Sequence, residues 1–434
     1  MAKDNKKKSK ETNTTTSPSS SNDAGVVEQD HSKDNKSSSS SNVSTKTTKP
    51  IIDKSTLINR ATLKYPLFSC ASGGNTDLVA VGGGGGVSKT GVPNGVTVFR
   101  WVEGMLQQLE TLTADDCVSN IAFHPSLDQF AYGTRSNCHI VNFNNKLTSF
   151  EVKQTFESIP PKESKKVEES SGKREEPLLQ QTCRYNRDGN RLITGGSDNS
   201  VRVWKMPECK LLNTLRGEHS DEITDVDIHP HGSHIVTTSK DKTCRVWNLV
   251  SGKVEHTFRR KHNGVDLGFR GCRFSVDGLS IFVVLSTPRG KNTAGIAIVS
   301  QYNLATGREE QTRQVHTVHN TCFELSPNGK YLAIGTGDSF ITVVDTDSLK
   351  RVDRWEPHEF VITGIAFSPD SQNVVSVSAD YTITAHKIGT GPKDLDYKLI
   401  MNGMNLYFNN DDGLGDSTTS TSVHVNESKE RMNE

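Results

Sequence analysis

The residues with the clearest potential for chemistry form a glycine-rich loop. Five consecutive glycines, Gly82–Gly86, are followed by Val87-Ser88-Lys89-Thr90. Residues 83–90 therefore match the phosphate-binding pattern G-x-x-x-x-G-K-[ST] except at one position, where Ser88 replaces the second glycine. That pattern binds phosphate because a helix begins directly after the lysine and directs its N–H groups at the anion. Here Gly91-Val92-Pro93-Asn94-Gly95 follows, which breaks a helix, and Val96–Phe99 alternates like a strand. We therefore interpret the loop as a protrusion between two strands and not as a nucleotide site.

Histidines and aspartates, the other candidates for chemistry, recur at fixed places in a repeated unit. Recurrence favours a structural role at tight turns over acid–base catalysis, which needs a single matched set of groups. The sequence also lacks G-x-S-x-G, H-E-x-x-H and clustered Cys/His spacings, so we predict no catalytic residues and no metal ligands. The recurring residues are His124, His219, His229, His231 and His358, and Asp198, Asp241, Asp338 and Asp380.

The repeated unit consists of an alternating apolar strand, a turn, a second strand, a turn with aspartate and a third strand. Its first turn recurs roughly every 42–51 residues, except across one longer interval that contains a charged insert. The fullest copies are Gly195–Trp204 and Thr238–Trp247, and His219 precedes the second of them. These copies resemble WD repeats, in which the histidine, a Ser/Thr, the aspartate and the tryptophan form a buried hydrogen-bond chain.

The resemblance implies an all-β fold, a seven-bladed WD-repeat β-propeller over residues 57–401. The outer strand of blade seven has two candidates, Leu57–Leu63 and Leu395–Met401, and the first would clasp the ring shut. The predicted blades span 62–103, 113–150, 178–207, 219–249, 268–304, 318–349 and 358–390.

Three polar segments flank or interrupt the repeats. The N-terminal segment 1–53, the mixed-charge insert 151–178 and the tail 402–434 contain too few large apolar side chains to offset the entropy of ordering, so we predict disorder for each. Formal net charge is zero, which argues against nucleic acid as a partner. The eight cysteines show no zinc spacing and fit a reducing compartment.

No part of the sequence has the pattern of a membrane segment. The N-terminus lacks the apolar core of a signal peptide, and no run approaches the roughly 20 apolar residues that cross a bilayer. By its letters alone, the chain is expected to be soluble and cytosolic.

The divergent first repeat carries a more specific resemblance. It reads Tyr65-Pro66-Leu67, then Leu78-Val79-Ala80-Val81 into the glycine loop as far as Asn94, then Val96–Phe99. This arrangement is similar to the endoplasmic-reticulum exchange factors for the Sar-type small GTPase, the prolactin regulatory element-binding protein family.

The resemblance implies that the loop projects from the propeller, engages the GTPase and promotes GDP release, which starts coat assembly for transport to the Golgi. It further implies a place on the cytosolic face of the endoplasmic reticulum, although members usually carry a membrane-spanning helix and this sequence shows none. Exposed carbonyls of such a loop could hold a monovalent cation; no other cofactor is expected. The implied GTPase-binding residues are Gly83, Gly84, Gly85, Gly86, Lys89, Thr90, Gly91, Val92, Pro93 and Asn94.

Two alternatives compete with the exchange factor. A WD-repeat scaffold or adaptor would share the propeller, but it has no need of five glycines followed by Lys-Thr-Gly-Val-Pro-Asn. Sequence-specific DNA binding, suggested only by the family name, is opposed by the neutral charge and by the lack of a basic recognition element.

Overall fold

The structure is a computed structural model that describes residues 57–87, 91–144, 149–160, 177–287, 295–391, 399–401 and 404–406. The chain separates into two compact units, Met1–Ile52 and Asp53–Glu434, and every described residue belongs to the second unit. The N-terminal segment predicted to be disordered therefore lies outside the described residues. No helix that could cross a membrane occurs among the described residues.

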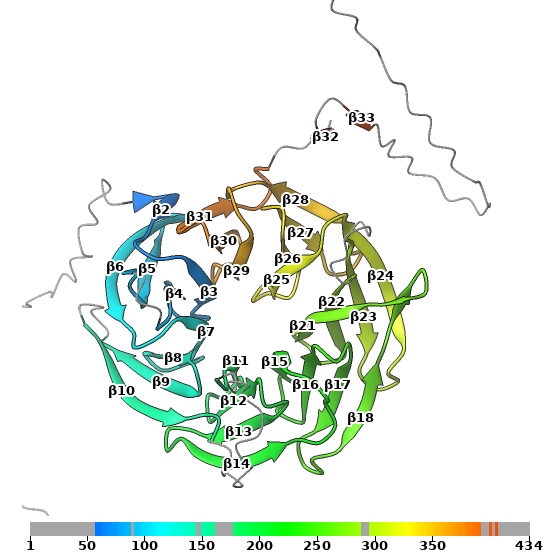
Figure 1. The fold of residues 1–434 in the computed structure, drawn as a ribbon, viewed down its shortest axis with the longest axis horizontal. Helices are drawn as coiled ribbons and strands as arrows, with labels where there is room; N and C mark the ends of the chain where they lie inside the picture. Colours follow the sequence, from blue (N-terminus) through cyan, green and yellow to red (C-terminus); the bar gives the residue numbers. More distant parts are fainter. Residues whose placement is uncertain are drawn as a thin grey trace, which may run out of the picture. The chain divides into compact units, whose positions relative to one another are not determined.

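Seven antiparallel sheets, six of four strands and one that β1 (Leu57–Ile58) extends to five, form a ring, as the WD-repeat resemblance predicted (Figure 1). Blades one to three comprise β3 (Leu67–Ser72), β4 (Leu78–Gly83), β5 (Gly95–Val102) and β6 (Met105–Thr113); β7 (Val118–Phe123), β8 (Gln129–Thr134), β9 (Asn137–Phe143) and β10 (Phe150–Glu157); and β11 (Gln180–Tyr185), β12 (Arg191–Gly196), β13 (Val201–Lys205) and β14 (Lys210–Leu215).

Blades four to seven continue the same order from the inner to the outer strand. They comprise β15 (Ile223–Ile228), β16 (His234–Ser239), β17 (Cys244–Asn248) and β18 (Val254–Phe258); β21 (Gly268–Phe274), β22 (Ser280–Ser286), β23 (Ala297–Asn303) and β24 (Glu309–His316); β25 (Asn320–Leu325), β26 (Tyr331–Thr336), β27 (Ile341–Asp345) and β28 (Arg351–Trp355); and β29 (Ile362–Phe367), β30 (Asn373–Ser378), β31 (Thr382–Lys387) and β2 (Arg60–Thr62).

The N-terminal candidate for ring closure is confirmed. Strand β2 pairs with β31 of blade seven, with Arg60 opposite Thr384. Just before it, β1 (Leu57–Ile58) pairs with β6 as a fifth strand of blade one. One short segment thus joins the first and last blades, and the C-terminal strand β32 (Leu399–Met401) pairs instead with β33 (Met404–Leu406).

The charged insert begins later than predicted, which corrects the range 151–178. Residues 150–157 form β10, whose ladder with β9 includes Phe150 opposite Phe143. Phe150 is buried, but most of the strand is exposed because β10 lies on the outside of blade two. Three of the charges assigned to the insert, those of Glu151, Lys153 and Glu157, belong to a solvated outer strand. Residues 161–176, which contain most of the insert's charges, lie outside the described part of the chain.

The hydrophobic core lies between neighbouring blades. Tyr65, Leu67 and Val79 of the first blade pack with Val375 and Val377 of the seventh. Full burial of such side chains contributes about 1.5–3 kcal/mol each relative to exposure. All eight cysteines are free thiols, and four of them are buried, with at most 2% of their surface exposed.

The predicted WD hydrogen-bond chain is present in blade four. His219 Nδ1 lies 2.9 Å from Asp241 Oδ2, and His219 Nε2 lies 2.8 Å from Thr237 Oγ1. The Trp247 indole donates to the same Thr237 oxygen at 2.9 Å. In blade seven His358 Nε2 lies 2.8 Å from Ser376 Oγ, but its Nδ1 bonds Thr382 Oγ1 at 2.7 Å, with Asp380 at 3.4 Å.

The turn histidines also have a structural role. His124 Nε2 lies 3.1 Å from the Gly189 carbonyl oxygen of the following blade. His229 Nε2 makes the equivalent contact with Gly278, again at 3.1 Å. These repeated contacts tie neighbouring blades together.

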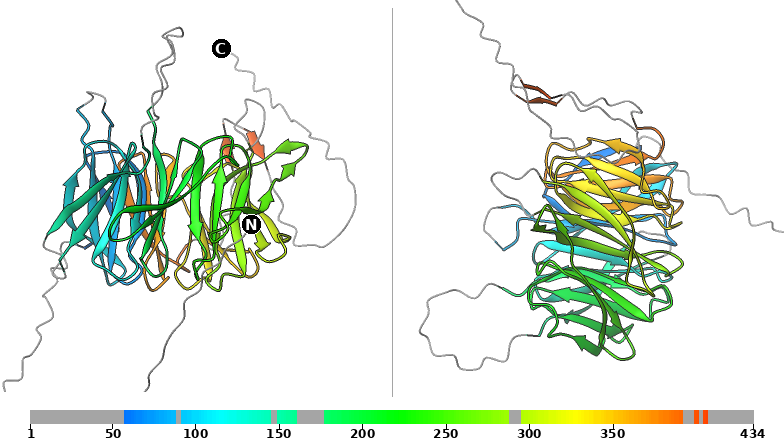
Figure 2. Two further views of the ribbon diagram at one scale, coloured as in Figure 1. Left: turned by 90° about the horizontal axis from the view of Figure 1, so that it is seen from below. Right: turned by 90° about the vertical axis from the view of Figure 1, so that its right-hand side faces the viewer.

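Strand order assigns every loop to one of two faces. Because successive strands run in opposite directions, connections between second and third strands lie on the same face as connections from one blade to the next; we call this the upper face. Connections between first and second strands, and between third and fourth strands, lie on the lower face. The β4–β5 connection and the hairpin of β19 (Lys261–His262) and β20 (Val265–Asp266) both project from the upper face (Figure 2, left).

Candidate functional site: the glycine loop of blade one

The glycine loop connects β4 to β5 and rises from the upper face of blade one (Figure 2). The ladder between these strands runs up to Gly83 opposite Gly95, and the loop occupies residues 84–94. No helix follows Lys89-Thr90, because β5 begins at Gly95. The strand-to-strand interpretation is therefore confirmed, and the arrangement of a phosphate-binding loop is absent.

The base of the loop requires glycine. A Cβ on Gly83 would lie 1.9 Å from the Pro66 carbonyl oxygen, and the Gly84 N–H donates to that same oxygen at 3.0 Å. Gly84 has φ 141° and Gly86 has φ 71°, conformations that side chains disfavour. The chain thus turns away from the sheet at a point where a side chain would collide with Pro66 or Asn94.

Asn94 holds the loop in its conformation. Its Oδ1 accepts a hydrogen bond from the Gly86 N–H at 2.8 Å, and its Nδ2 donates to the Gly86 carbonyl at 3.2 Å. A Cβ on Gly84 would lie only 2.1 Å from Asn94 Oδ1, so glycine and asparagine fit closely against each other. The Asn94 carbonyl accepts from the Ala114 N–H at 3.1 Å, which anchors the clasp to β6 and its following turn.

The remaining predicted loop residues divide into exposed and packed groups. Val87 is 64% exposed, and Gly91 and Pro93 are also exposed. Val92 is half-buried and packs against the core shared by blades one and seven. Lys89 and Thr90 lie outside the described residues. The exposed Val87 and Pro93 are therefore available to a partner, whereas Val92 anchors the loop to the propeller.

A carboxylate lies beside the loop on blade two. Asp116 Oδ1 is 3.5 Å from the position that a Gly86 Cβ would occupy. The other oxygen, Oδ2, forms an ion pair with Arg135, which offsets the carboxylate charge. Asp116 Oδ1 also accepts a hydrogen bond from the Cys117 N–H at 2.7 Å, so both carboxylate oxygens have partners. Within the described residues, no group of three His, Cys, Asp or Glu side chains is arranged to hold a metal ion.

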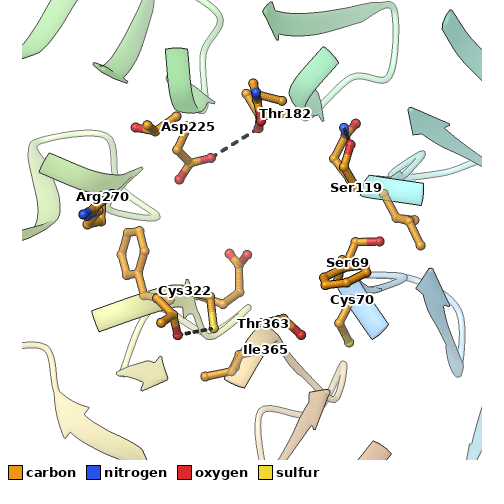
Figure 3. Close-up of a pocket in the computed structure, with 18 of the residues that line it drawn as sticks. Ser69, Cys70, Ser119, Thr182, Asp225, Arg270, Cys322, Thr363 and Ile365 are labelled. Carbon is orange, nitrogen blue, oxygen red and sulfur yellow. Dashed lines mark hydrogen bonds between the residues drawn. The ribbon is translucent and has the colours of Figure 1, made fainter. Parts of the chain in front are cut away.

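The centre of the ring contains a second polar site, a cavity of about 160 Å³ lined by the inner strands (Figure 3). Arg184 of β11 contacts Glu324 of β25 at 2.6 Å. Arg273 of β21 contacts Glu324 at 2.9 Å and Asp225 of β15 at 2.5 Å. The cluster therefore links the inner strands of blades three to six.

Electrostatics support a structural role for this cluster. Burial raises the pKa of the Asp225 carboxyl to about 7 and that of Asp227 to about 6, opposed in part by the Arg184 guanidinium. Arg184 and Arg273 are paired with carboxylates, and Arg270, which also lines the cavity, donates to Ser286 Oγ at 3.4 Å. The sequence carries a signal for this cluster: the residue before the first turn alternates in charge from blade three to blade six, as Arg184, Asp227, Arg273 and Glu324, although the ion pair of blade four is made by Asp225.

Comparisons with known proteins agree with this architecture. The family described as WD domain, G-beta repeat matches residues 181–205, 209–248 and 349–384. Guanine nucleotide-exchange factor SEC12 of Rattus norvegicus is 25% identical over 344 residues, which cover 70% of this chain and 82% of that protein. SEC12-like protein 2 of Arabidopsis thaliana is 26% identical over 200 residues, or 45% of this chain and 48% of that protein. THO complex subunit 3 of Arabidopsis thaliana is 24% identical over 264 residues, or 60% of this chain and 79% of that protein.

Proposed function

Because the chain is a seven-bladed WD-repeat propeller homologous to the SEC12 guanine nucleotide-exchange factors, we propose that it promotes GDP release from a Sar-type small GTPase. In this role it starts coat assembly for transport from the endoplasmic reticulum to the Golgi, on the cytosolic face of the reticulum. The observation that carries the proposal is the glycine loop, which is clasped by Asn94 and projects from a rigid blade.

An exchange factor of this kind performs no covalent chemistry. Small GTPases can bind nucleotide with picomolar affinity, a binding free energy of about 16 kcal/mol, so unaided release is slow. A partner accelerates release if it binds the nucleotide-free GTPase more tightly than the GDP-bound form. The rate of GDP release rises to the extent that this preference is already present in the transition state for release. Each 1.4 kcal/mol by which it lowers that barrier speeds release about tenfold.

The loop suits this task because its geometry is set before the GTPase arrives. Gly83 and Gly84 are buried at the base of the loop and Gly85 and Gly86 are half-buried, so the glycines let the chain turn sharply without side chains that would obstruct a partner at the tip. The clasp between Asn94 and Gly86 reduces the entropy lost when the GTPase fixes the loop. The GTPase-binding loop of the proposal is Gly83–Gly86 and 89–94. Within it Gly83, Gly84, Val92 and Asn94 shape and anchor the loop, Pro93 is an exposed contact, and Val87 is an additional exposed contact.

We further propose that the loop takes up a monovalent cation. Carbonyl oxygens of the glycine run and the Asp116 carboxylate beside Gly86 would hold it. The bound cation would stiffen the loop. If so, the melting temperature will rise when choline chloride is replaced by potassium chloride at constant ionic strength, and it will rise less in Asp116→Asn. Equal melting temperatures of the wild-type chain in the two salts would exclude the cation.

A binding experiment distinguishes the exchange factor from a scaffold. The chain is titrated into a Sar-type GTPase in its nucleotide-free, GDP-bound and GTP-bound forms. An exchange factor will bind the nucleotide-free form at least tenfold more tightly than the GDP-bound form. Equal affinity for all three forms would support the scaffold instead.

A further inference from the structure

Blade seven carries an aromatic residue at a turn position that is polar in other blades. Tyr381 lies in the β30–β31 connection, the same upper-face connection that forms the glycine loop in blade one. The equivalent residues are Asn199 in blade three, Lys242 in blade four and Ser339 in blade six. The turns correspond closely: the N–H of Tyr381, Lys242 and Ser339 each donates to the carbonyl of the residue three positions earlier, at 3.2, 3.1 and 3.3 Å.

Tyrosine is an unusual residue for the backbone conformation at position 381. All four residues adopt positive φ, with values of 73° for Tyr381, 62° for Asn199, 63° for Lys242 and 75° for Ser339. Positive φ is least unfavourable for asparagine and is a clear outlier for a bulky residue. Because positive φ recurs at this position in other blades, it belongs to the turn itself, and what distinguishes blade seven is the aromatic ring carried there. Tyr381 is 37% exposed, so part of its surface is open to a partner.

A second exposed aromatic residue lies in the adjoining upper-face connection, between β28 and β29. Phe360 is 60% exposed. Its equivalent in blade four is Asp221, since each follows the WD histidine by two positions. The two backbones are also bonded alike: the Phe360 carbonyl accepts from Ser378 Oγ at 3.2 Å, and the Asp221 carbonyl accepts from Ser239 Oγ at 2.8 Å. The fold thus accepts aspartate at this position, and an apolar ring in water brings it no stability.

These aromatic residues and the glycine loop lie on neighbouring blades of one face. Blades seven and one are adjacent in the ring (Figure 1), and they share the core cluster against which Val92 of the loop packs. The Tyr381 carbonyl accepts from the Leu63 N–H at 2.8 Å, in the segment that joins the two blades. A globular partner that contacts the exposed Val87 can therefore also reach blade seven.

We propose that Phe360 and Tyr381 form a second, apolar contact area for the GTPase that the glycine loop engages. The proposal rests on the proposed function and extends it from one loop to two blades. The matching surface of the GTPase is apolar, since two exposed aromatic rings gain most when a partner removes them from water. Aromatic side chains are enriched among the residues that dominate binding energy in protein interfaces. The loop would act on the nucleotide site, and the aromatic pair would hold the GTPase in place.

The test uses substitutions that the fold already accepts. In Phe360→Asp and Tyr381→Lys, each residue is replaced by its equivalent from blade four, so the turns keep their hydrogen bonds and their positive φ. The matched control is Val250→Asp, because Val250 is 95% exposed but lies on the lower face, in the β17–β18 connection. Dissociation constants for the nucleotide-free GTPase and melting temperatures are measured for all variants.

We expect the double variant Phe360→Asp/Tyr381→Lys to weaken GTPase binding by 10- to 100-fold, with Val250→Asp within twofold of wild type and all melting temperatures similar. If the double variant binds like wild type while Gly84→Ala binds weakly, the aromatic contact is refuted and the proposed function stands. If the wild-type chain does not bind the GTPase, both are refuted. If the double variant instead loses only cosedimentation with phospholipid vesicles, the pair contacts a membrane and the proposal is wrong.

Discussion

Substitution of Asn94 by alanine tests whether the loop is pre-organised for exchange. The change removes both hydrogen bonds to Gly86, at 2.8 and 3.2 Å, and leaves the backbone contact to Ala114 in place. A hydrogen bond of this type contributes a net 0.5–1.5 kcal/mol, so the clasped conformation loses about 1–3 kcal/mol relative to open conformations. Since the ladder between β4 and β5 is untouched, the propeller itself is expected to remain folded.

The corresponding kinetic effect follows from the same free energies. If the GTPase engages the clasped loop, its second-order rate constant for GDP release falls by about 5- to 150-fold. The assay is release of a fluorescent GDP analogue from the GTPase, with the concentration of the chain varied below saturation. The melting temperature should change by no more than a few degrees.

Asn75→Ala is the matched control for this experiment. Asn75 also lies in a loop of blade one, but on the lower face, where its side chain donates to the Pro125 carbonyl. The control variant is expected to release GDP at the wild-type rate. A wild-type rate in Asn94→Ala would refute the reasoning, because the clasp would then have no part in exchange. A loss of activity accompanied by unfolding would show instead that the loop supports the propeller.

Three further predictions concern the loop and the blades. Gly84→Ala is expected to slow GDP release more than tenfold because its Cβ has no space, whereas Gly91→Ala, at φ 77° with no atom within 4 Å of its Cβ, should slow release only several-fold. Burial lowers the pKa of His358 to about 4, opposed in part by Asp380, so between pH 6.5 and 4 the unfolded chain takes up a proton at this residue that the folded chain does not. The free energy of unfolding in urea should therefore fall between these pH values by about 3 kcal/mol more in the wild-type chain than in His358→Asn. Thr237→Val should reduce the free energy of unfolding by about 2–4 kcal/mol, measured in urea at pH 7. The reason is that the buried Trp247 indole and the buried His219 imidazole both lose the Thr237 hydroxyl as a hydrogen-bond partner.

Features encoded within one repeat could be predicted from the sequence. The hydrogen-bond chain of blade four follows from the spacing of His219, Asp241 and Trp247, because each blade folds its own residues into the same register. The strand-to-strand nature of the glycine loop follows from the proline and glycines after Lys89, which prevent a helix. Both features depend only on residue spacing within one repeat and on the backbone preferences of proline and glycine.

Features that depend on neighbouring blades could not be predicted in the same way. The polar cluster at the centre of the ring joins Arg184 to Glu324 across 140 residues, and its charge alternation becomes visible only when the blades are aligned. The outer strand β10 escaped prediction because an element exposed on most of its surface has no apolar alternation. Asn94 was expected to contact the GTPase, and the structure shows that its side chain is engaged with Gly86. A side chain that closes a loop and one that meets a partner have the same polar character in sequence.

The measurement that tests the central claim most directly is GDP release from a Sar-type GTPase in the presence of catalytic amounts of this chain. The account predicts that release becomes faster in proportion to the concentration of the wild-type chain, and that Gly84→Ala removes most of this acceleration while the propeller stays folded. Release at the unaided rate with the folded wild-type chain, from a GTPase that still releases GDP when Mg²⁺ is chelated, would contradict it.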